Sequence, residues 1–413
     1  MRGDAGFKSR NNAVGQTYLG SLLVDIKSGW SPACDAYPPA YGEWGVLRVS
    51  SVTSGHFRPE ESKRLPPVLQ PRPELEIKAG DVLVARANGA RSLVGTACFV
   101  ENYRPCLMLS DKILRLVPDE MAADPRFLVI LFTTNGVRRQ IANLLNGGSG
   151  QNNISQADIR SLAVPLIPLA LQSQVVAVHS AFGRRIAALE NASRKLAVVE
   201  AAMSENALSQ ENLSRWNRGR LENIATVATG VTLGSEPVGD GTIELPYLRV
   251  ANVLDGRIDV TDVKTVRIVR SQYERFALEK GDLLLTEGGD LDKLGRGAVW
   301  DGRIGECLHQ NHVFRVRCGE HILPDFLALY TSSSAGRSYF QSVGKQTTNL
   351  ASINSTQVKK MMVPLPPLTE QDRVMVPIRA IRERVSSLTR QIAKLRITQR
   401  GVVEDLLSGG RSR

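Results

Sequence analysis

Two loops of this chain carry side chains that can hydrogen-bond to the edges of nucleic-acid bases. The run 151–153 reads Gln-Asn-Asn and the run 345–349 reads Lys-Gln-Thr-Thr-Asn, and each precedes a short predicted helix. Amide and guanidinium groups can pair with two atoms of one base edge in the major groove. Lysine and backbone amides bind phosphates and so set the position of a protein on the duplex. The pattern predicts one DNA-contacting loop in each half of the chain.

Polar residues in neighbouring loops complete two candidate DNA-binding sets. The candidates in the first half are Arg86, Asn88, Arg91, Gln151, Asn152 and Asn153. The candidates in the second half are Lys293, Arg296, Gln310, Asn311, His312, Lys345, Gln346, Thr347, Thr348 and Asn349. The alternative for each of them is a solvated side chain without a ligand, because polar residues are mostly exposed whether or not they bind anything.

The motifs of a DNA-modifying or DNA-cleaving enzyme are missing from the sequence. It contains no Gly-x-x-x-x-Gly-Lys-Ser/Thr phosphate loop and no Gly-x-Gly-x-x-Gly turn after a strand. The run 37–39, Tyr-Pro-Pro, lacks the Asn or Asp that amino-methyltransferases place before two prolines. The acidic run 287–292 could be a nuclease metal site, but it contains two glycines and has no counterpart in the first half. We therefore expect no catalytic residue and no metal ligand in this chain.

Length and charge indicate a multidomain protein with a polyanionic partner. The chain has 413 residues, which predicts two or three domains that each bury a core. Its net charge is +11 and its pI is near 9.6. Such a balance favours nucleic acid as the partner, with an anionic membrane surface as the second choice.

The cysteines and the hydropathy pattern predict a cytoplasmic protein. The five cysteines are scattered without a Cys-x-x-Cys pair, which argues against a zinc site or a disulfide framework and fits a reducing compartment. No apolar run reaches the roughly 18 residues of a membrane span. The first 16 residues are too polar for a signal peptide.

A long internal repeat organises the chain. A proline-rich segment at 164–169, followed by Gln172, leads into five apolar residues spaced seven apart, and the segment at 363–368, followed by Gln371, does the same. The predicted seam positions are Val175, Phe182, Leu189, Leu196 and Met203, and then Val374, Ile381, Leu388, Leu395 and Val402. All five pairs are 199 residues apart. Spacing by seven is typical of a coiled coil, and solenoid repeats have periods of only about 20–50 residues. We therefore predict a duplicated domain plus helix, against the alternative of two unrelated surface helices.

The domains before the two helices share a pattern of short β-like runs. Gly29 and Gly230, and Gly80-Asp81 and Gly281-Asp282, recur at an offset of 201. The loops between these points differ almost completely, as at 85–91 and 286–293. A common framework with unlike loops suggests two ligand sites of one kind.

The predicted fold class is α+β, with two similar mixed α/β domains in tandem, each followed by a long helix. Within this plan, one helix is predicted over 125–145, Ser155 is predicted to cap a helix over 156–162, and Thr369 is predicted to cap the last helix. The expected divisions are a flexible leader 1–16, a domain 17–168, a helix 169–208, a linker 209–219, a domain 220–368, a helix 369–409 and a tail 410–413.

These features resemble the specificity subunit of type I restriction-modification systems. The resemblance rests on the two proline-rich segments with Gln172 and Gln371, the Gly-Asp strands and the run 345–349, and it covers about residues 17–409. It implies two target recognition domains that each read half of a bipartite, asymmetric DNA sequence, and two helices packed as an antiparallel coiled-coil spacer. It also implies partners: two modification (methyltransferase) subunits and restriction (ATP-dependent translocase and nuclease) subunits. S-adenosylmethionine, ATP and Mg²⁺ would belong to those partners, and the cell would be prokaryotic.

Two other functions stay open on the sequence. The chain could be an active DNA methyltransferase or nuclease, although the missing motifs argue against it. It could also be a coiled-coil adaptor protein that does not bind DNA sequence-specifically and whose basic charge is incidental. Salt dependence and sequence dependence of DNA binding distinguish these possibilities.

Overall fold

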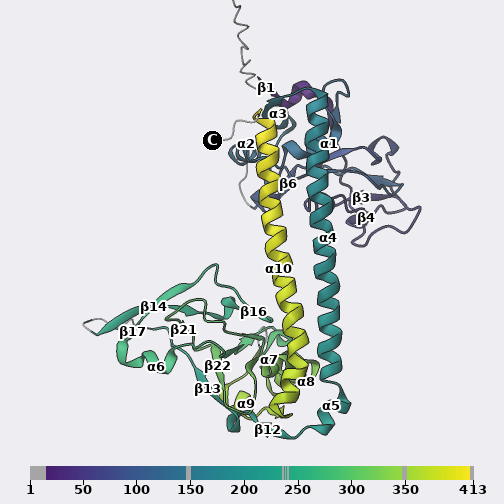
Figure 1. Ribbon diagram of the computed structural model, residues 1–413. Helices are drawn as coiled ribbons and strands as arrows, with labels where there is room; N and C mark the ends of the chain where they lie inside the picture. The colour runs from purple at the N-terminus through teal and green to yellow at the C-terminus, as the bar shows by residue number, and fades with distance from the viewer. Residues whose placement is uncertain are drawn as a thin grey trace, which may run out of the picture. The chain divides into compact units, whose positions relative to one another are not determined.

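The structure is a computed structural model that describes residues 15–145, 150–234, 237, 239, 241–346 and 351–409. The chain divides into two compact units. The first consists of Met1–Glu190 with Arg390–Arg413, and the second of Asn191–Thr389. Two long helices, α4 (Leu169–Ala207) and α10 (Leu368–Leu407), each contribute residues to both units (Figure 1).

The first unit is built on two small sheets. The larger is antiparallel, and its strands lie in the order β2 (Leu23–Ser28), β9 (Ile113–Pro118), β5 (Val82–Ala85) and β7 (Ala97–Phe99). The smaller has the order β4 (Ser62–Arg64), β3 (Gly45–Leu47) and β8 (Leu107–Met108), with β3 and β8 parallel. Every residue of β5 is fully buried, because apolar side chains pack on both faces of this strand. The core of the unit therefore surrounds β5.

The second unit repeats this topology strand for strand. Its larger sheet has the order β13 (Ala225–Thr229), β22 (Val313–Cys318), β18 (Leu283–Thr286) and β20 (Gly297–Val299). Its smaller sheet has the order β17 (Lys264–Val269), β14 (Thr242–Leu248) and β21 (Leu308–His309). The prediction of an α+β fold made of two similar domains is confirmed.

Ribbons of two or three strands and short helices complete each unit. In the first unit they are β1 (Gly15–Tyr18) with β11 (Ala163–Leu166), β6 (Ala87–Asn88) with β10 (Asn152–Asn153), α1 (Pro125–Leu131), α2 (Asn135–Leu144) and α3 (Gln156–Arg160). In the second they are β12 (Arg218–Arg220) with β25 (Met362–Pro364), β15 (Val253–Leu254) with β16 (Arg257–Ile258), β19 (Gly288–Gly289) with β24 (Ala351–Ser352) and β23 (Lys345–Gln346), α5 (Gln210–Arg215), α6 (Tyr273–Phe276), α7 (Pro324–Ser332), α8 (Ser334–Val343) and α9 (Ser355–Lys359). The 3-10 turns are η1 (Leu19–Leu22), η2 (Val49–Ser51), η3 (Pro73–Leu75), η4 (Arg91–Leu93), η5 (Leu221–Asn223), η6 (Val250–Asn252), η7 (Arg270–Gln272) and η8 (Leu291–Lys293).

Three helix boundaries can be compared with those predicted from the sequence. The single helix predicted over 125–145 is wrong: the chain forms α1 and α2, because Thr134 ends the first by donating to the Leu131 carbonyl and caps the second. Ser155 does cap α3, in a capping box with Asp158, as predicted. Thr369 is not an N-cap, since α10 already begins at Leu368. The Pro367 carbonyl accepts the N–H groups of Glu370 and Gln371 at 2.8 and 3.0 Å, so Pro367 is the residue that precedes the helix.

The glycine pair at 29 and 230 allows a close backbone approach in each unit. A Cβ atom on Gly29 would lie 1.9 Å from the carbonyl oxygen of Leu109, and one on Gly230 would lie 1.8 Å from the carbonyl oxygen of His309. The next residue donates its N–H to the same carbonyl in both units, at 3.0 and 2.7 Å. Only glycine permits this crossing, which explains why the residue recurs at the offset of the repeat.

A buried glutamine near the start of each long helix joins that helix to its domain. The side-chain oxygen of Gln371 accepts the N–H of Leu323 at 2.8 Å, and its nitrogen donates to the carbonyls of His321 and Pro366, both at 2.9 Å. Gln172 makes the same three bonds, at 2.8–3.0 Å, with residues that lie 199 positions earlier: Asp124, Ala122 and Ile167. Both side chains are at most 1% exposed. The repeat therefore preserves a complete hydrogen-bonded junction.

Within each unit a stretch of α4 lies antiparallel to a stretch of α10, as Figure 1 shows. In the first unit Gln399 donates to the His179 carbonyl at 2.9 Å and Arg396 pairs with Glu190 at 2.6 Å. In the second unit Arg382 pairs with Glu200 at 2.6 Å. Of the ten predicted seam residues, three are buried, namely Val175, Leu189 and Leu388. The other seven are partly buried: Phe182, Leu196, Met203, Val374, Ile381, Leu395 and Val402.

Towards its two ends α10 also packs on the domain cores. Met375 and Ile378 join the apolar core of the second unit, and Val403 and Leu407 join that of the first. Met375 and Val403 each lie one position after a predicted seam residue, because the helix there faces a domain as well as its partner helix. The apolar stripe of α10 thus serves two kinds of packing.

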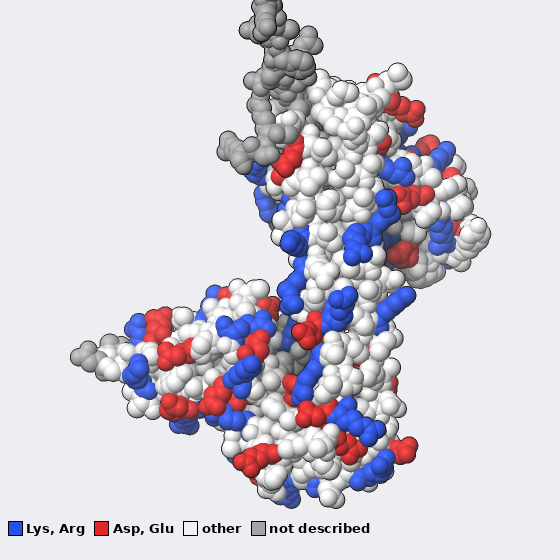
Figure 2. Space-filling view, viewed as in Figure 1, with Lys and Arg blue, Asp and Glu red and all other residues white. Residues whose placement is uncertain are grey.

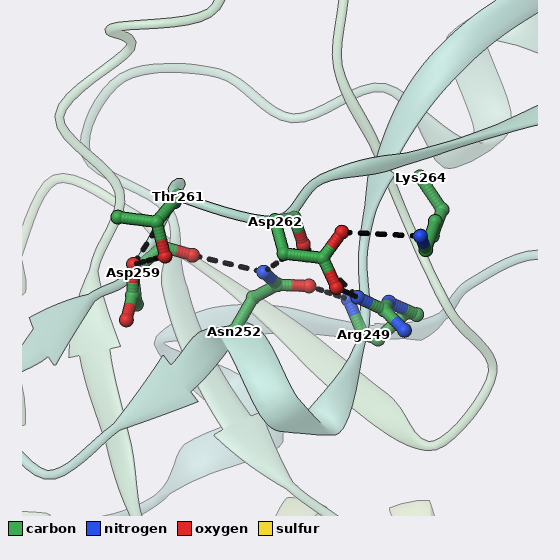
Figure 3. Close-up of polar contacts among 6 residues, drawn as sticks. All are labelled: Arg249, Asn252, Asp259, Thr261, Asp262 and Lys264. Atoms are coloured by element: carbon green, nitrogen blue, oxygen red, sulfur yellow. Dashed lines mark hydrogen bonds and ion pairs between the residues drawn. The ribbon is translucent and has the colours of Figure 1, made fainter. Parts of the chain in front are cut away.

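A polar network holds the loop that follows β14 in the second unit (Figure 3). The side chain of buried Asn252 accepts the N–H of Arg249 at 2.9 Å and donates to the carbonyls of Asp259 and Asp262 at 2.9 and 3.0 Å. Hydrogen bonds from Arg249 and Lys264 lower the pKa of Asp262. Those from Thr261 lower the pKa of Asp259. Both carboxylates therefore stay charged to a lower pH than an unpaired aspartate does.

Candidate nucleic-acid interface

In the first unit a short ribbon brings together two of the loops chosen from the sequence. Strand β6 pairs antiparallel with β10, and Asn88 lies opposite Asn152. The Asn152 side chain donates to the Gly89 carbonyl at 3.0 Å. Asn153 is exposed and Asn88 is half-buried, so both can present polar atoms to a ligand. Residues 64 positions apart thus form one polar surface.

Two arginines flank this ribbon. Arg91 donates to the Ala142 carbonyl at 3.1 Å and, at 3.5 Å, to the side-chain oxygen of Asn152. The Arg86 guanidinium reaches the Asp111 carbonyl at 3.5 Å. Gln151 is exposed immediately before β10. All six candidates of the first half therefore lie on or beside the β6–β10 ribbon.

The second unit forms the equivalent ribbon with one more strand. β24 lies between β19 and β23, with Ser352 opposite both Gly288 and Lys345. Lys345 and Gln346 on β23 are exposed. Lys293 lies at the end of η8, where it forms an ion pair with Asp290. The candidates Thr347, Thr348 and Asn349 fall outside the residues that the structure describes.

The turn between β21 and β22 adjoins this ribbon. The N–H groups of Gln310 and Asn311 donate to the carbonyls of Leu248 and Val231, both at 2.9 Å, so the main chain of these two residues is held inside the domain. Their side chains are half-buried, while His312 is exposed. Arg296 is half-buried, and its Nε atom is buried without a hydrogen-bond partner in the described part of the chain. His312 is the candidate of this group that contacts Glu287, the residue immediately before β19.

Glu287, which the sequence analysis did not place among the DNA-binding candidates, lies where the turn meets the ribbon. Its N–H donates to the His312 carbonyl at 3.0 Å, and its carboxylate lies 2.5 Å from the Nδ1 atom of the same histidine. Its own carbonyl accepts the N–H of Ile353 at 2.9 Å. The signal that could have identified it is the repeat, since Glu287 stands 201 residues after the candidate Arg86.

Charges of both signs lie on the surface of the second unit. Figure 2 shows Lys and Arg intermixed with Asp and Glu over the viewed face of the second unit. The net charge of +11 is therefore not gathered into one basic patch on that face. Among the side chains that the structure describes, no three His, Cys, Asp or Glu side chains come together as metal ligands. The helices in the described ranges include none that is long and apolar enough to cross a membrane.

Comparison with known proteins shows which proteins this sequence resembles. Residues 214–394 match the family described as type I restriction modification DNA specificity domain. The specificity subunit of the Escherichia coli type I restriction enzyme EcoEI is 38% identical over 169 residues, which are 40% of this chain and 28% of that protein. The EcoKI specificity subunit of E. coli K12 is 22% identical over 366 residues, 84% of this chain and 77% of that protein. The first of these matches thus spans less than a third of that relative's length.

Two solved structures share the fold over almost the whole chain. A chain from a structural study of complex assembly and conformational transition of the type I R-M system aligns with a TM-score of 0.54 at 17% identity, covering 97% of this chain and 98% of that one. The S subunit of the type I restriction-modification system from M. genitalium aligns with a TM-score of 0.53 at 14% identity, covering 97% of each chain. The duplicated domains and their helix junctions agree with these matches: residues 214–394 match the type I restriction modification DNA specificity domain, and almost the whole chain shares the fold of these two structures.

Proposed function

We propose that this chain is the DNA sequence-specificity subunit of a type I restriction-modification enzyme, with each domain reading one half of a bipartite, asymmetric DNA target. The observation that carries the proposal is the repeated scaffold with unlike polar ribbons. The framework residues Gln172 and Gln371 make the same bonds in both units. The ribbons, in contrast, carry Asn88 and Asn152 in one unit and Lys345 and Gln346 in the other. Two different donor and acceptor patterns on one scaffold suit an asymmetric sequence.

The catalytic chemistry belongs to partner subunits in this proposal. Two modification (methyltransferase) subunits would dock on the long helices and supply the S-adenosylmethionine site. Restriction subunits would supply ATP-driven translocation and Mg²⁺-dependent cleavage, all in the cytoplasm of a prokaryotic cell. The names of the relatives as specificity subunits and the lack of nucleotide-binding motifs in the sequence support this division of labour.

Selection from a random-sequence DNA pool tests the proposal. The native complex, purified from its source through a tag on this chain, would be mixed with random duplexes, and the retained DNA would be sequenced. The expected result is two defined blocks separated by an unspecified gap of constant length. Retention without any sequence preference would instead support a coiled-coil adaptor. Methyl transfer or DNA cleavage by the purified chain alone would support an enzyme.

Shortening both long helices by one heptad is expected to shorten the gap and to leave the two blocks unchanged. Deleting 184–190 from α4 and 392–398 from α10 removes both members of the Glu190–Arg396 ion pair together. Seven helical residues span about 10 Å, and base pairs are stacked about 3.4 Å apart. The expected change is therefore up to about three base pairs, measured by the same selection.

A length-neutral variant is the control for this deletion. It keeps all residues of the two heptads but permutes the exposed ones, and we expect the gap of the unmodified chain. Altered block sequences with an unchanged gap in the deletion variant would contradict a spacer function of the helices.

A further inference from the structure

Residue 86 of the first unit and residue 287 of the second occupy the same place in the repeated fold. The N–H of Arg86 donates to the carbonyl of Lys112 at 2.8 Å, and the N–H of Glu287 donates to the carbonyl of His312 at 3.0 Å. The carbonyl of Arg86 accepts from Ile154 at 3.0 Å. That of Glu287 accepts from Ile353 at 2.9 Å. The backbone of both residues is thus held by equivalent neighbours on both sides.

Residues 86 and 287 lie between a buried core strand and the first strand of the exposed ribbon. Arg86 follows β5 and precedes β6, and Glu287 follows β18 and precedes β19. The preceding residues Ala85 and Thr286 are at most 1% exposed. Both side chains at the position itself are half-buried. A side chain placed here starts from a rigid strand and reaches the ribbon surface, which suits a residue that must be positioned accurately.

The two side chains have opposite chemistry. The Arg86 guanidinium can only donate hydrogen bonds, and it matches the two acceptors O6 and N7 of guanine. The Glu287 carboxylate, when ionised, can only accept, and the base groups that donate in the major groove are the amino groups of cytosine and adenine. A carboxylate cannot serve as a phosphate contact, because both groups are negative. Its position directly before β19, in a region that also carries Lys345 and Lys293, is better explained by base recognition.

A neighbouring side chain orients the carboxylate. The Nδ1 atom of His312 lies 2.5 Å from one carboxylate oxygen of Glu287, which leaves the other oxygen for a ligand. Lys112 takes the place of His312 beside Arg86, and it pairs with Asp111 at 3.3 Å. The sign of the charge is therefore reversed at residue 86/287 while the backbone frame around it is kept.

We propose that residues 86 and 287 are equivalent specificity-determining positions, at which Arg86 selects guanine in one half-site and Glu287 selects a base with an exocyclic amino group, cytosine or adenine, in the other. This inference rests on the proposed function, because it assigns one base position within each half-site. It also predicts that the two positions can be exchanged, since only the side chain differs.

The decisive variant is Glu287→Arg, tested by selection from a random-sequence duplex pool with the complete native complex. We expect one position of one half-site to change from cytosine or adenine to guanine, with a preference of about tenfold, while the other half-site stays unchanged. Glu287→Gln should weaken the original preference at the same position by about tenfold. Arg86→Gln should relax a guanine in the opposite half-site and nothing else.

Two controls keep the outcome interpretable. Glu244→Gln removes an exposed carboxylate from β14 of the same unit, so it reproduces the change in charge of Glu287→Gln, and we expect the unmodified target sequence. In Glu287→Gln the new side chain has nearly the shape of the native one. This variant therefore tests the inference if Glu287→Arg fails to fold. An unmodified complex that selects no sequence would overturn the proposed function and this inference together. An unmodified complex with a clear bipartite target that Glu287→Gln and Arg86→Gln leave unaltered at every position would overturn this inference alone.

Discussion

Replacing Gln371 with leucine is expected to lower the free energy of unfolding of the second unit by about 2–4 kcal/mol. Leucine is similar in size but leaves three buried groups without their partner: the N–H of Leu323 and the carbonyls of His321 and Pro366. Each unsatisfied buried group costs about 1–3 kcal/mol, and partial access of water would recover some of the loss. Hydrogen–deuterium exchange of the full chain, followed by peptide mass, measures the loss of protection in residues 191–389.

The matched variant Gln172→Leu provides an internal comparison. It breaks the same three bonds in the first unit, so the loss of protection should move to that unit. Gln174→Leu, two residues further along α4 at an exposed position, should change the stability by less than about 0.5 kcal/mol. Equal effects of Gln371→Leu and Gln174→Leu would show that the buried junction does not stabilise the fold.

The second unit is expected to lose stability in mild acid through His309. This side chain is fully buried, and its Nδ1 atom lies 2.7 Å from the Val313 carbonyl. Its Nε2 atom has no hydrogen-bond partner in the described part of the chain. Burial lowers the pKa of His309 from 6.5 to about 4, and the nearby guanidinium groups of Arg315 and Arg317 act in the same direction.

The sign of the effect follows from this lowered pKa. The unfolded chain binds a proton at His309 below about pH 6.5, whereas the folded chain binds it only near pH 4, so protons favour unfolding in this window. At pH 5 the loss relative to pH 7.5 amounts to about 2 kcal/mol. His309→Leu, which installs the residue that the first unit has at Leu109, should remove this loss. Urea unfolding of both proteins at pH 7.5 and pH 5 gives the difference, because other titrating groups contribute equally to both.

The backbone of His309 takes part in the crossing that Gly230 permits. The His309 carbonyl accepts the N–H of Val231 at 2.7 Å, next to the position that has no room for a Cβ atom. Identical pH dependence of the native protein and His309→Leu would contradict the assigned cause. Stability of His309→Leu that is unchanged at pH 7.5 would show that leucine packs there as Leu109 does.

The duplication can be predicted from the sequence because it depends on local features. Each seam residue is specified by a helical spacing of seven, and Gln172 and Gln371 stand at the same place behind a proline-rich segment. The α+β fold class and the cap at Ser155 follow from the same kind of short-range pattern. The division of 125–145 into two helices could also have been predicted from the sequence. Threonine is a favoured N-cap residue, and Thr134 caps the second helix.

Which strands pair in the polar ribbons is determined by the tertiary structure alone. Asn88 meets Asn152, and Gly288 meets Ser352, across more than 60 residues, and their register is set by how β5 and β18 pack in the cores rather than by the ribbons themselves. The place of Glu287 beside His312, and its equivalence to Arg86, likewise depend on backbone hydrogen bonds between distant loops. Local spacing determines helices and repeats, whereas the neighbours of a loop side chain are determined by which strands the core brings together.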